Sequence, residues 1–369
     1  MNQIEILKNL VSIESCSGNE QNISKYIFDY LESLSLKPIK VGENIYLHIK
    51  GKDHAKCLIF NGHIDTVSVG NEEEWKYSPF SGKVIDGKMY GLGSSDMKAG
   101  VATMIVLTEY YSKTVPPCDL IFTFVVNEEV DGSGSDQIVK WMVKQKKLSS
   151  YKEKAALILE PTNLENILIG CKSNVFLKIT VKGDSGHGSM PALINVNAID
   201  QMTMVIGEIK KIEKKIKKEY FNETLGYPTL SVTNIVGGNL SCPNKFTGEC
   251  SISLDVRGSE KLTKNIEKIL KEYLKKWKVK IEKIYPLAYE SVTLKNEKIV
   301  KIMKDITKGK VTVSNSSNDS GFFTKIKIPV VVFGPGDEKV THKSNEYVNL
   351  NSYLKSVEIY KEVIEKYAM

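Results

Sequence analysis

Residue types that bind metal ions follow directly after short apolar segments of this sequence. His63 lies three residues after the apolar run 57–60, and Asp65 follows two residues later. A neutral imidazole is a common zinc ligand, and a nearby carboxylate can fix its tautomer. Because open α/β sheets place their sites at strand ends, His63 is a candidate ligand and Asp65 a candidate orienting group.

Two further apolar runs end in carboxylates. Glu128 and Glu129 follow the run 120–126, and Glu160 follows the run 155–159. Neighbouring side chains of a strand point to opposite sides. One of two adjacent glutamates can therefore bind a metal ion while the other takes a proton from a bound water.

Asp96 and His342 extend this set. Asp96 lies in the glycine-rich segment 91–100, and His342 follows the apolar run 330–333. The segment 91–100 lacks the spacing of a phosphate-binding loop, which argues against a nucleotide site. A carboxylate at such a loop-to-helix junction can instead bridge two metal ions. Together, two histidines and three carboxylates form a nitrogen and oxygen donor set that suits a pair of zinc ions.

The elements that must position these residues are indicated by hydrophobic periodicity. Buried strands alternate with helices: residues 4–34 are predicted to form amphipathic helices, and single helices are predicted at 99–111, 136–147 and 296–308. This alternation predicts an α/β catalytic domain with a mixed, mostly parallel sheet flanked by helices, made of residues 1–172 and 288–369. Residues 173–287 instead show a β-α-β-β-α-β order, which predicts an inserted, ferredoxin-like α+β sandwich.

Length and composition are those of a globular protein with two domains. The chain has 369 residues, 41% of them hydrophobic, and no run reaches the roughly 18 apolar residues of a membrane helix. Its first residues do not resemble a secretory signal, so we expect a cytoplasmic protein without a membrane partner. The net charge of +7 comes mainly from lysines interleaved with glutamates on helical stretches. We therefore expect solvated helix faces and no nucleic-acid partner.

Arginine usage is unusual. Of the 51 basic residues, only Arg257 is an arginine. A planar guanidinium can grip a carboxylate with two hydrogen bonds, which a lysine cannot do. Arg257 is therefore a candidate for binding a substrate carboxylate.

The motifs, taken in order, resemble those of the zinc aminoacylase and metallopeptidase family, which includes acetylornithine deacetylase, succinyl-diaminopimelate desuccinylase and glutamate carboxypeptidase. The resemblance covers essentially the whole chain, and it rests on the motifs His63-x-Asp65, Gly93-x-x-Asp96-Met97-Lys98-x-Gly100, Glu128-Glu129, Glu160-Pro161-Thr162, Gly186-His187-Gly188-Ser189 and Gly334-Pro335-Gly336 with His342.

The resemblance implies a role for each metal-site residue. It places His63 and Glu160 on one zinc ion, Glu129 and His342 on the other, and Asp96 on both. Cobalt or manganese are possible substitutes. Glu128 is then the general base that deprotonates the attacking water and passes the proton to the leaving amine.

The resemblance also implies that the inserted domain is a lid through which a homodimer forms. His187 then reaches across from the partner subunit to stabilise the oxyanion. Arg257 matches the family arginine near the substrate carboxylate, and Asp319 lies in a loop that resembles a substrate-side loop. Leu240 occupies the position of a substrate-contacting asparagine, so Asn244 or Asn239 is the candidate replacement.

These expectations lead to one preferred function and two alternatives. The preferred function is removal of the acyl group from a small N-acyl amino acid, of the acetylornithine or succinyl-diaminopimelate kind. A carboxypeptidase or dipeptidase on the same scaffold is the first alternative. The second, a module whose basic helices bind an acidic partner, is disfavoured because the metal-ligand set is complete.

Overall fold

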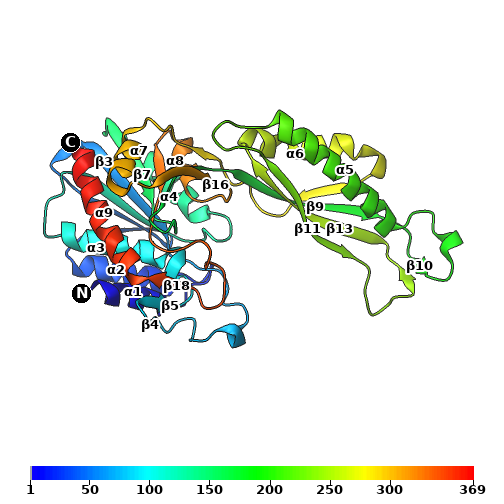
Figure 1. Ribbon diagram of the computed structural model, residues 1–369, viewed down its shortest axis with the longest axis horizontal. Coiled ribbons are helices and arrows are strands. Elements are labelled where there is room, and N and C mark those ends of the chain that lie inside the picture. Colours follow the sequence, from blue (N-terminus) through cyan, green and yellow to red (C-terminus); the bar gives the residue numbers. More distant parts are fainter. Residues whose placement is uncertain (1) are drawn as a thin grey trace. The chain divides into compact units, whose positions relative to one another are not determined.

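The computed structural model describes residues 2–369, which form two compact units (Figure 1). The first unit takes the chain up to Gly170 together with Ser291–Val313 and Asn318–Met369. The second takes Cys171–Glu290 and Ser314–Ser317. The second unit is thus an insertion into the sequence of the first.

A nine-stranded sheet runs through the first unit in the order β1-β2-β6-β3-β7-β17-β8-β15, and β16 pairs with β8. Its strands are β1 (Ile39–Val41), β2 (Asn44–Ile49), β3 (Asp53–His63), β6 (Cys118–Val125), β7 (Glu153–Ile158), β8 (Asn166–Cys171), β15 (Ser291–Val292), β16 (Lys310–Ser314) and β17 (Val330–Val332). The central strands β6, β3, β7 and β17 pair in parallel, whereas β1–β2, β2–β6 and β17–β8 pair antiparallel. Parallel pairing brings the carboxyl ends of β6, β3 and β7 to one edge of the sheet.

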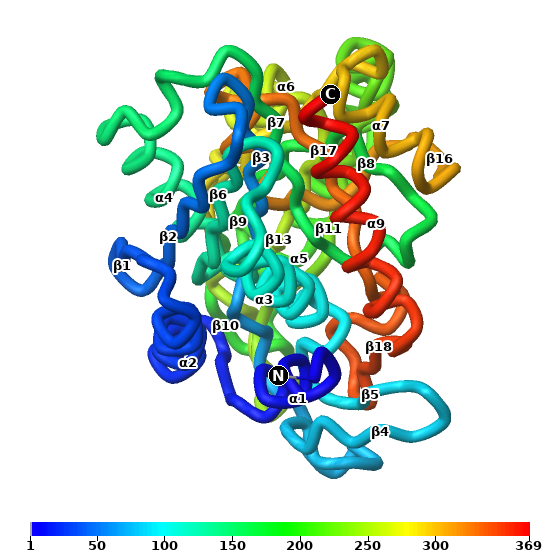
Figure 2. The backbone as a smooth tube through the Cα atoms, turned by 90° about the vertical axis from the view of Figure 1, so that its left-hand side faces the viewer, coloured from blue at the N-terminus to red at the C-terminus, as the bar shows by residue number. Residues whose placement is uncertain are grey.

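Helices cover both faces of this sheet. They are α1 (Gln3–Val11), α2 (Gln21–Ser33), α3 (Ala99–Tyr111), α4 (Ser133–Lys144), α7 (Lys298–Thr307), α8 (Ser320–Lys325) and α9 (Leu350–Ala368). Helices α1, α2, α3, α7 and α9 share one core with the face that carries Leu58 and Phe60, and Figure 2 shows α3 and α9 in front of the strands. Helices α4 and α8 pack on the face that carries Ile59. Because both faces are buried, the middle of each central strand is apolar, at 57–60 in β3, 120–122 in β6 and 155–158 in β7.

A small sheet lies at the edge of the first unit in the order β18-β5-β4. Its strands are β4 (Lys83–Ile85), β5 (Lys88–Tyr90) and β18 (Tyr347–Asn349). The pairing of Tyr347 with Tyr90 ties the segment after His342 to the segment before Asp96. Both of these segments carry predicted metal ligands.

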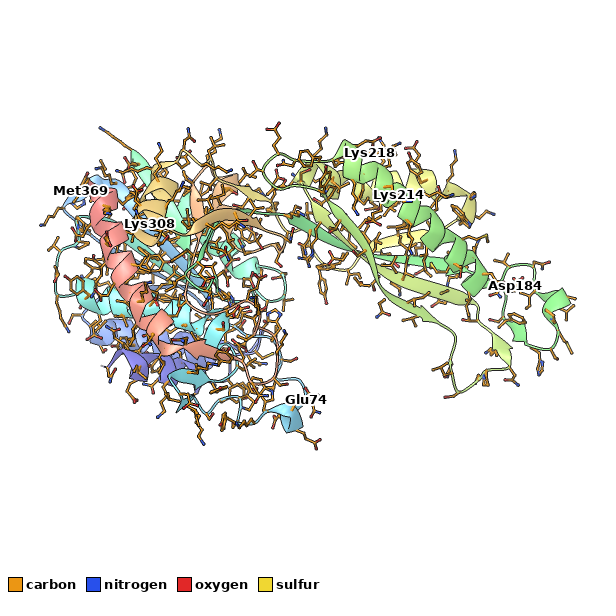
Figure 3. All side chains as sticks on the ribbon, in the orientation of Figure 1. Glu74, Asp184, Lys214, Lys218, Lys308 and Met369 are labelled. Carbon is orange, nitrogen blue, oxygen red and sulfur yellow. The ribbon has the colours of Figure 1, made fainter. Side chains whose placement is uncertain are left out.

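The second unit contains a four-stranded antiparallel sheet in the order β11-β13-β9-β14. Its elements are β9 (Ser173–Lys182), β10 (Gly186–His187), α5 (Ala198–Glu219), β11 (Thr229–Gly237), β12 (Lys245–Phe246), β13 (Glu249–Gly258), α6 (Glu260–Tyr273) and β14 (Lys280–Lys283). Helices α5 and α6 cover one face of the sheet (Figure 1) and share its apolar core. Lys214 and Lys218, labelled in Figure 3, lie on the exposed face of α5.

The predicted fold class is confirmed: a mixed sheet, parallel at its centre and flanked by helices, with an inserted β-α-β-β-α-β unit. Strand β2 and helix α9 were not predicted from the sequence. Among residues 2–369, no helix is long and apolar enough to cross a membrane.

Candidate metal centre

Three neighbouring strands deliver predicted ligands to one edge of the central sheet. His63 is the last residue of β3, Glu128 and Glu129 follow β6, and Glu160 follows β7. Because β3 pairs in parallel with both β6 and β7, these side chains meet. The donor atoms of His63, Glu128 and Glu160 lie within 4.8 Å of one another.

Asp96 lies between the two predicted histidine ligands. Its Oδ1 is 3.1 Å from Nε2 of His63, and its Oδ2 is 3.4 Å from Nε2 of His342. The turn before it depends on Gly93, which has a φ of 73° and whose Cβ, if present, would lie 2.5 Å from Thr66. Each carboxylate oxygen of Asp96 thus faces a different histidine, as a bridging ligand requires.

The remaining ligands fall into two groups around Asp96. Glu160 Oε1 lies 3.7 Å from Nε2 of His63, and Glu129 Oε2 lies 3.0 Å from Nε2 of His342. Glu128 Oε2 is the more distant carboxylate of the His63 side, at 4.0 Å from Nε2. The arrangement therefore offers two adjacent binding positions and one nearby carboxylate that can remain free.

Asp65 organises the backbone of this site. Its carboxylate accepts the backbone N–H groups of Glu128 and Glu129, both at 3.1 Å, and the hydroxyl of Ser17 at 2.7 Å. Nδ1 of His63 lies closer to the carbonyl oxygen of Asp65, at 3.1 Å, than to its carboxylate, at 3.5 Å. Asp65 therefore fixes the adjacent glutamates as well as the imidazole.

Acidic side chains are concentrated in this centre. Burial, followed by the negative charges of Glu160 and Asp319, raises the pKa of Glu128 well above its usual 4.5, against the opposing effect of His63. Hydrogen bonds to Asp96 and Glu129 raise the pKa of His342 to about 10. The carboxylates of Asp96, Glu128, Glu129 and Glu160 outnumber the histidines.

This donor set fits a pair of divalent cations. Two such ions would balance the negative charge of the four carboxylates, of which Glu128, Glu129 and Glu160 have raised pKa values because they are buried. Imidazole nitrogens and carboxylate oxygens, without a thiolate, suit zinc and its divalent neighbours.

Asp319 lies buried in the first unit, where only 1% of it is exposed. Burial raises the pKa of its carboxyl to about 7, and Ser135 is its hydrogen-bond partner. One of its oxygens, Oδ1, has no partner among the described residues. Its negative charge acts on Glu128 and Glu160, so it lies beside the candidate metal centre.

His187 and Asn244, both exposed, come together in the second unit. His187 pairs with Lys245 between β10 and β12, and the carbonyl oxygen of Asn244 accepts the backbone N–H of Gly188 at 2.6 Å. Nδ1 of His187 accepts the backbone N–H of Ser189 at 3.2 Å. The ring proton of a neutral His187 is therefore on Nε2, which can donate a hydrogen bond.

Arg257 lies near the carboxyl end of β13. Glu249, the first residue of this strand, precedes Arg257 by eight residues, and an extended strand of that length separates the two residues by about 26 Å. Nε of Arg257 donates to both carboxylate oxygens of Asp255 at 3.1 Å, and Nη1 donates to the carbonyl oxygen of Asn315 at 3.2 Å. The guanidinium is thus already held against a carboxylate of its own strand.

A cavity of about 620 Å³ opens beside His342 in the first unit. Val67, Trp75 and Leu92 form apolar parts of its wall, and Lys343 contributes a cation. A volume of this size accommodates a small organic substrate.

Three buried charged residues next to this site were not assigned a role from the sequence. Glu346, which is 1% exposed, accepts backbone N–H groups of the Asp96 segment, and Glu20 accepts the backbone N–H of Asn127 at 3.2 Å. Lys98 donates to the carbonyl oxygen of Ile13 at 2.7 Å, and burial lowers its pKa to about 7. Glu20 and Glu346 lie in polar segments without a periodic pattern that could have singled them out.

The fold and this donor set define a metallohydrolase. A model of Peptidase family M20/M25/M40 matches residues 59–366. The chain therefore belongs to this family, in which zinc dependence is typical, and the predicted family resemblance is confirmed.

Two relatives match nearly their whole length. Acetylornithine deacetylase of Buchnera aphidicola subsp. Schizaphis graminum is 27% identical over 386 residues, with 99% of this chain and 97% of the relative covered. Succinyl-diaminopimelate desuccinylase of Wigglesworthia glossinidia brevipalpis is 29% identical over 385 residues, with 99% of both covered.

Solved structures show the same fold at lower sequence identity. An M20 family metallo-carboxypeptidase from Sulfolobus solfataricus has a TM-score of 0.81 at 18% identity, with 100% of this chain and 99% of that chain covered. A dinuclear metal-binding peptidase of the M20 family from Bacillus subtilis has a TM-score of 0.66 at 13% identity, with coverages of 98% and 96%.

Proposed function

We propose that this protein hydrolyses the amide bond of a small N-acyl amino acid, as a deacylase of the acetylornithine or succinyl-diaminopimelate kind. The observation that carries the proposal is the position of Asp96, whose two oxygens face His63 and His342 at 3.1 and 3.4 Å. The substrate class is supported by the two full-length relatives, both of which are named as deacylases.

In this proposal, His63 and Glu160 would hold one zinc ion, Glu129 and His342 would hold the second, and Asp96 would serve as a ligand of both. When bound, the ions would acidify a water molecule and polarise the substrate carbonyl. The short contact between Glu129 and His342, at 3.0 Å, supports the choice of Glu129 as the ligand of the adjacent pair.

Glu128 then performs proton transfer. Its carboxylate takes a proton from the attacking water and donates it to the amine nitrogen as the C–N bond breaks. The products are a carboxylic acid and a free amine. Burial raises the pKa of Glu128, and a group that both accepts and releases a proton works best when its pKa is raised toward the working pH.

Residues of the second unit complete the proposal. Nε2 of His187 donates to the oxyanion from a partner subunit, Arg257 binds the substrate carboxylate, and Asn244 takes the role of the missing asparagine. Exposed apolar side chains such as Leu193 and Val236 support self-association through this unit. Asp319 is the remaining substrate-side residue of the proposal, and it lies in the first unit beside Glu128 and Glu160.

A peptidase is the alternative function, because the solved structure with a TM-score of 0.81 is a metallo-carboxypeptidase. The deciding experiment is a substrate panel of N-acetylornithine, N-succinyl-diaminopimelate, an N-acyl glutamate and a dipeptide. Metal-stripped protein is assayed with and without added zinc. Zinc-dependent turnover of an acyl substrate supports the deacylase, whereas turnover of the dipeptide alone supports the peptidase.

A further inference from the structure

Glu346 binds the backbone of the Asp96 segment with both oxygens of its carboxylate. Oε1 accepts the N–H groups of Ser95 at 2.7 Å and Asp96 at 3.0 Å, and Oε2 accepts the N–H of Gly93 at 2.9 Å. The carbonyl oxygen of Glu346 also accepts the N–H of Gly91 at 3.0 Å. Four hydrogen bonds thus join one buried residue to the segment that carries the proposed bridging ligand.

The Asp96 segment needs such a partner because its backbone is irregular. Asp96 has φ −118° and ψ 99°, outside the helical region, and the regular helix α3 begins only at Ala99. N–H groups that precede a helix have no acceptor within it. Buried N–H groups without an acceptor are costly, so the carboxylate of Glu346 stabilises this conformation over others.

Glu346 also lies only four residues after His342. Strand β18 begins at Tyr347 and is paired with β5, which fixes the end of this stretch. Asn345 holds the same stretch on its other side, because its side chain accepts the N–H of Lys76 at 2.6 Å. One short segment therefore carries both His342, a proposed ligand of one ion, and Glu346, which holds the backbone around Asp96, the proposed ligand of both ions.

We propose that Glu346 is a positioning residue that sets the orientation of Asp96 and thereby the affinity for both metal ions. The inference rests on the proposed two-metal function. Glu346 touches neither substrate nor metal in this proposal, and it acts only through the backbone of residues 93–96. Loss of the Glu346 carboxylate is expected to weaken the binding of both ions together, since Asp96 is the proposed ligand of both.

The test compares Glu346→Gln and Glu346→Ala with the wild-type chain. Zinc-loaded protein is titrated with a chromophoric chelator, and the release of each ion is followed. The glutamine keeps one oxygen for Ser95 and Asp96 but turns an amide donor toward the N–H of Gly93. We expect about a 10-fold loss of zinc affinity for glutamine and about 100-fold for alanine.

Asp119→Asn is the matched control. Asp119 is 3% exposed and accepts the backbone N–H of Gly51 at 2.8 Å, but it lies six residues before the end of β6, about 20 Å from the Glu128 end. This variant is expected to lower the melting temperature without changing zinc affinity. His342→Ala is a second comparison, because it should weaken the binding of one ion much more than the binding of the other.

The results separate a positioning role from a merely structural one. Graded loss of both ions in the two Glu346 variants, with kcat reduced and KM unchanged, supports the proposal. Wild-type zinc affinity in both variants, even with a lowered melting temperature, would overturn it. If wild-type protein binds two ions but hydrolyses nothing in the panel, the proposed function fails while the zinc titration still decides the role of Glu346.

Discussion

One carboxylate oxygen of Asp65 accepts the backbone N–H of Glu128 at 3.1 Å. The other accepts the next N–H along the chain at the same distance. The turn that presents the adjacent glutamates is thus held by a carboxylate from a different strand end. This link makes the position of the proposed base depend on a residue that need not touch substrate.

Asp65→Asn should therefore impair catalysis while the protein still folds. The asparagine amide would direct a donor at one of the two N–H groups, so one hydrogen bond is lost and the turn shifts. We expect kcat to fall about 10- to 100-fold. Steady-state kinetics measure the effect, and thermal unfolding of the same variant verifies the fold. Unchanged kcat would show that the turn keeps its position without this carboxylate.

Glu128→Gln should keep both metal ions and lose most turnover. The substitution preserves volume but removes the group that moves the proton, which is expected to lower kcat about 10²- to 10⁴-fold. Metal content is measured by elemental analysis alongside the assay. Glu129→Gln is the matched control, because it should lose metal. Retained activity in Glu128→Gln would remove this residue from the mechanism.

His187 can be placed in the partner's site by subunit mixing. His187→Ala and Glu128→Gln are each expected to be inactive. When unfolded together and refolded as mixed dimers, one site of each heterodimer contains both native residues, and about a quarter of wild-type activity should return. If His187 serves its own subunit, mixing restores nothing. Light scattering first establishes that the protein is dimeric.

Arg257→Lys should weaken binding of substrates that have a free carboxylate. Lysine retains the positive charge but cannot form the two parallel hydrogen bonds of a guanidinium. The loss of one charge-assisted hydrogen bond corresponds to about 10-fold in affinity. We expect KM to rise by about that factor with a smaller change in kcat. A substrate whose carboxylate is blocked as an amide is the control, and it should bind both proteins equally. An equal rise in KM for both substrates would assign Arg257 to folding of its strand.

Asp119 predicts a pH-dependent contribution to stability. Although burial opposes its ionisation, hydrogen bonds from Gly51, His54 and His48 hold the pKa of its carboxyl below the usual 3.8. Its ionised form therefore stabilises the folded state fully above pH 3.8, and this stabilisation is lost as the pH falls through the lower folded-state pKa. The difference in melting temperature between wild type and Asp119→Asn should be constant near neutrality and shrink below pH 3.8. A difference that grows in acid would contradict this assignment.

Local sequence patterns predict the strands that carry the ligands. Apolar runs ending at His63, before Glu128 and before Glu160 predict buried strands, and parallel neighbours bring their carboxyl ends together. The inserted unit was also predictable, because its alternating strands and amphipathic helices show clear local periods. These features depend on residues close in sequence.

The other groups that support the site come together only in the folded chain. Glu346 and Gly93 are 253 residues apart, and their hydrogen bond follows from the pairing of β18 with β5. Asp65 and Glu129 are likewise joined across 64 residues. A carboxylate becomes a positioning group only when the fold brings unpaired N–H groups to it, and hydrophobic periodicity contains no information about which N–H groups these are.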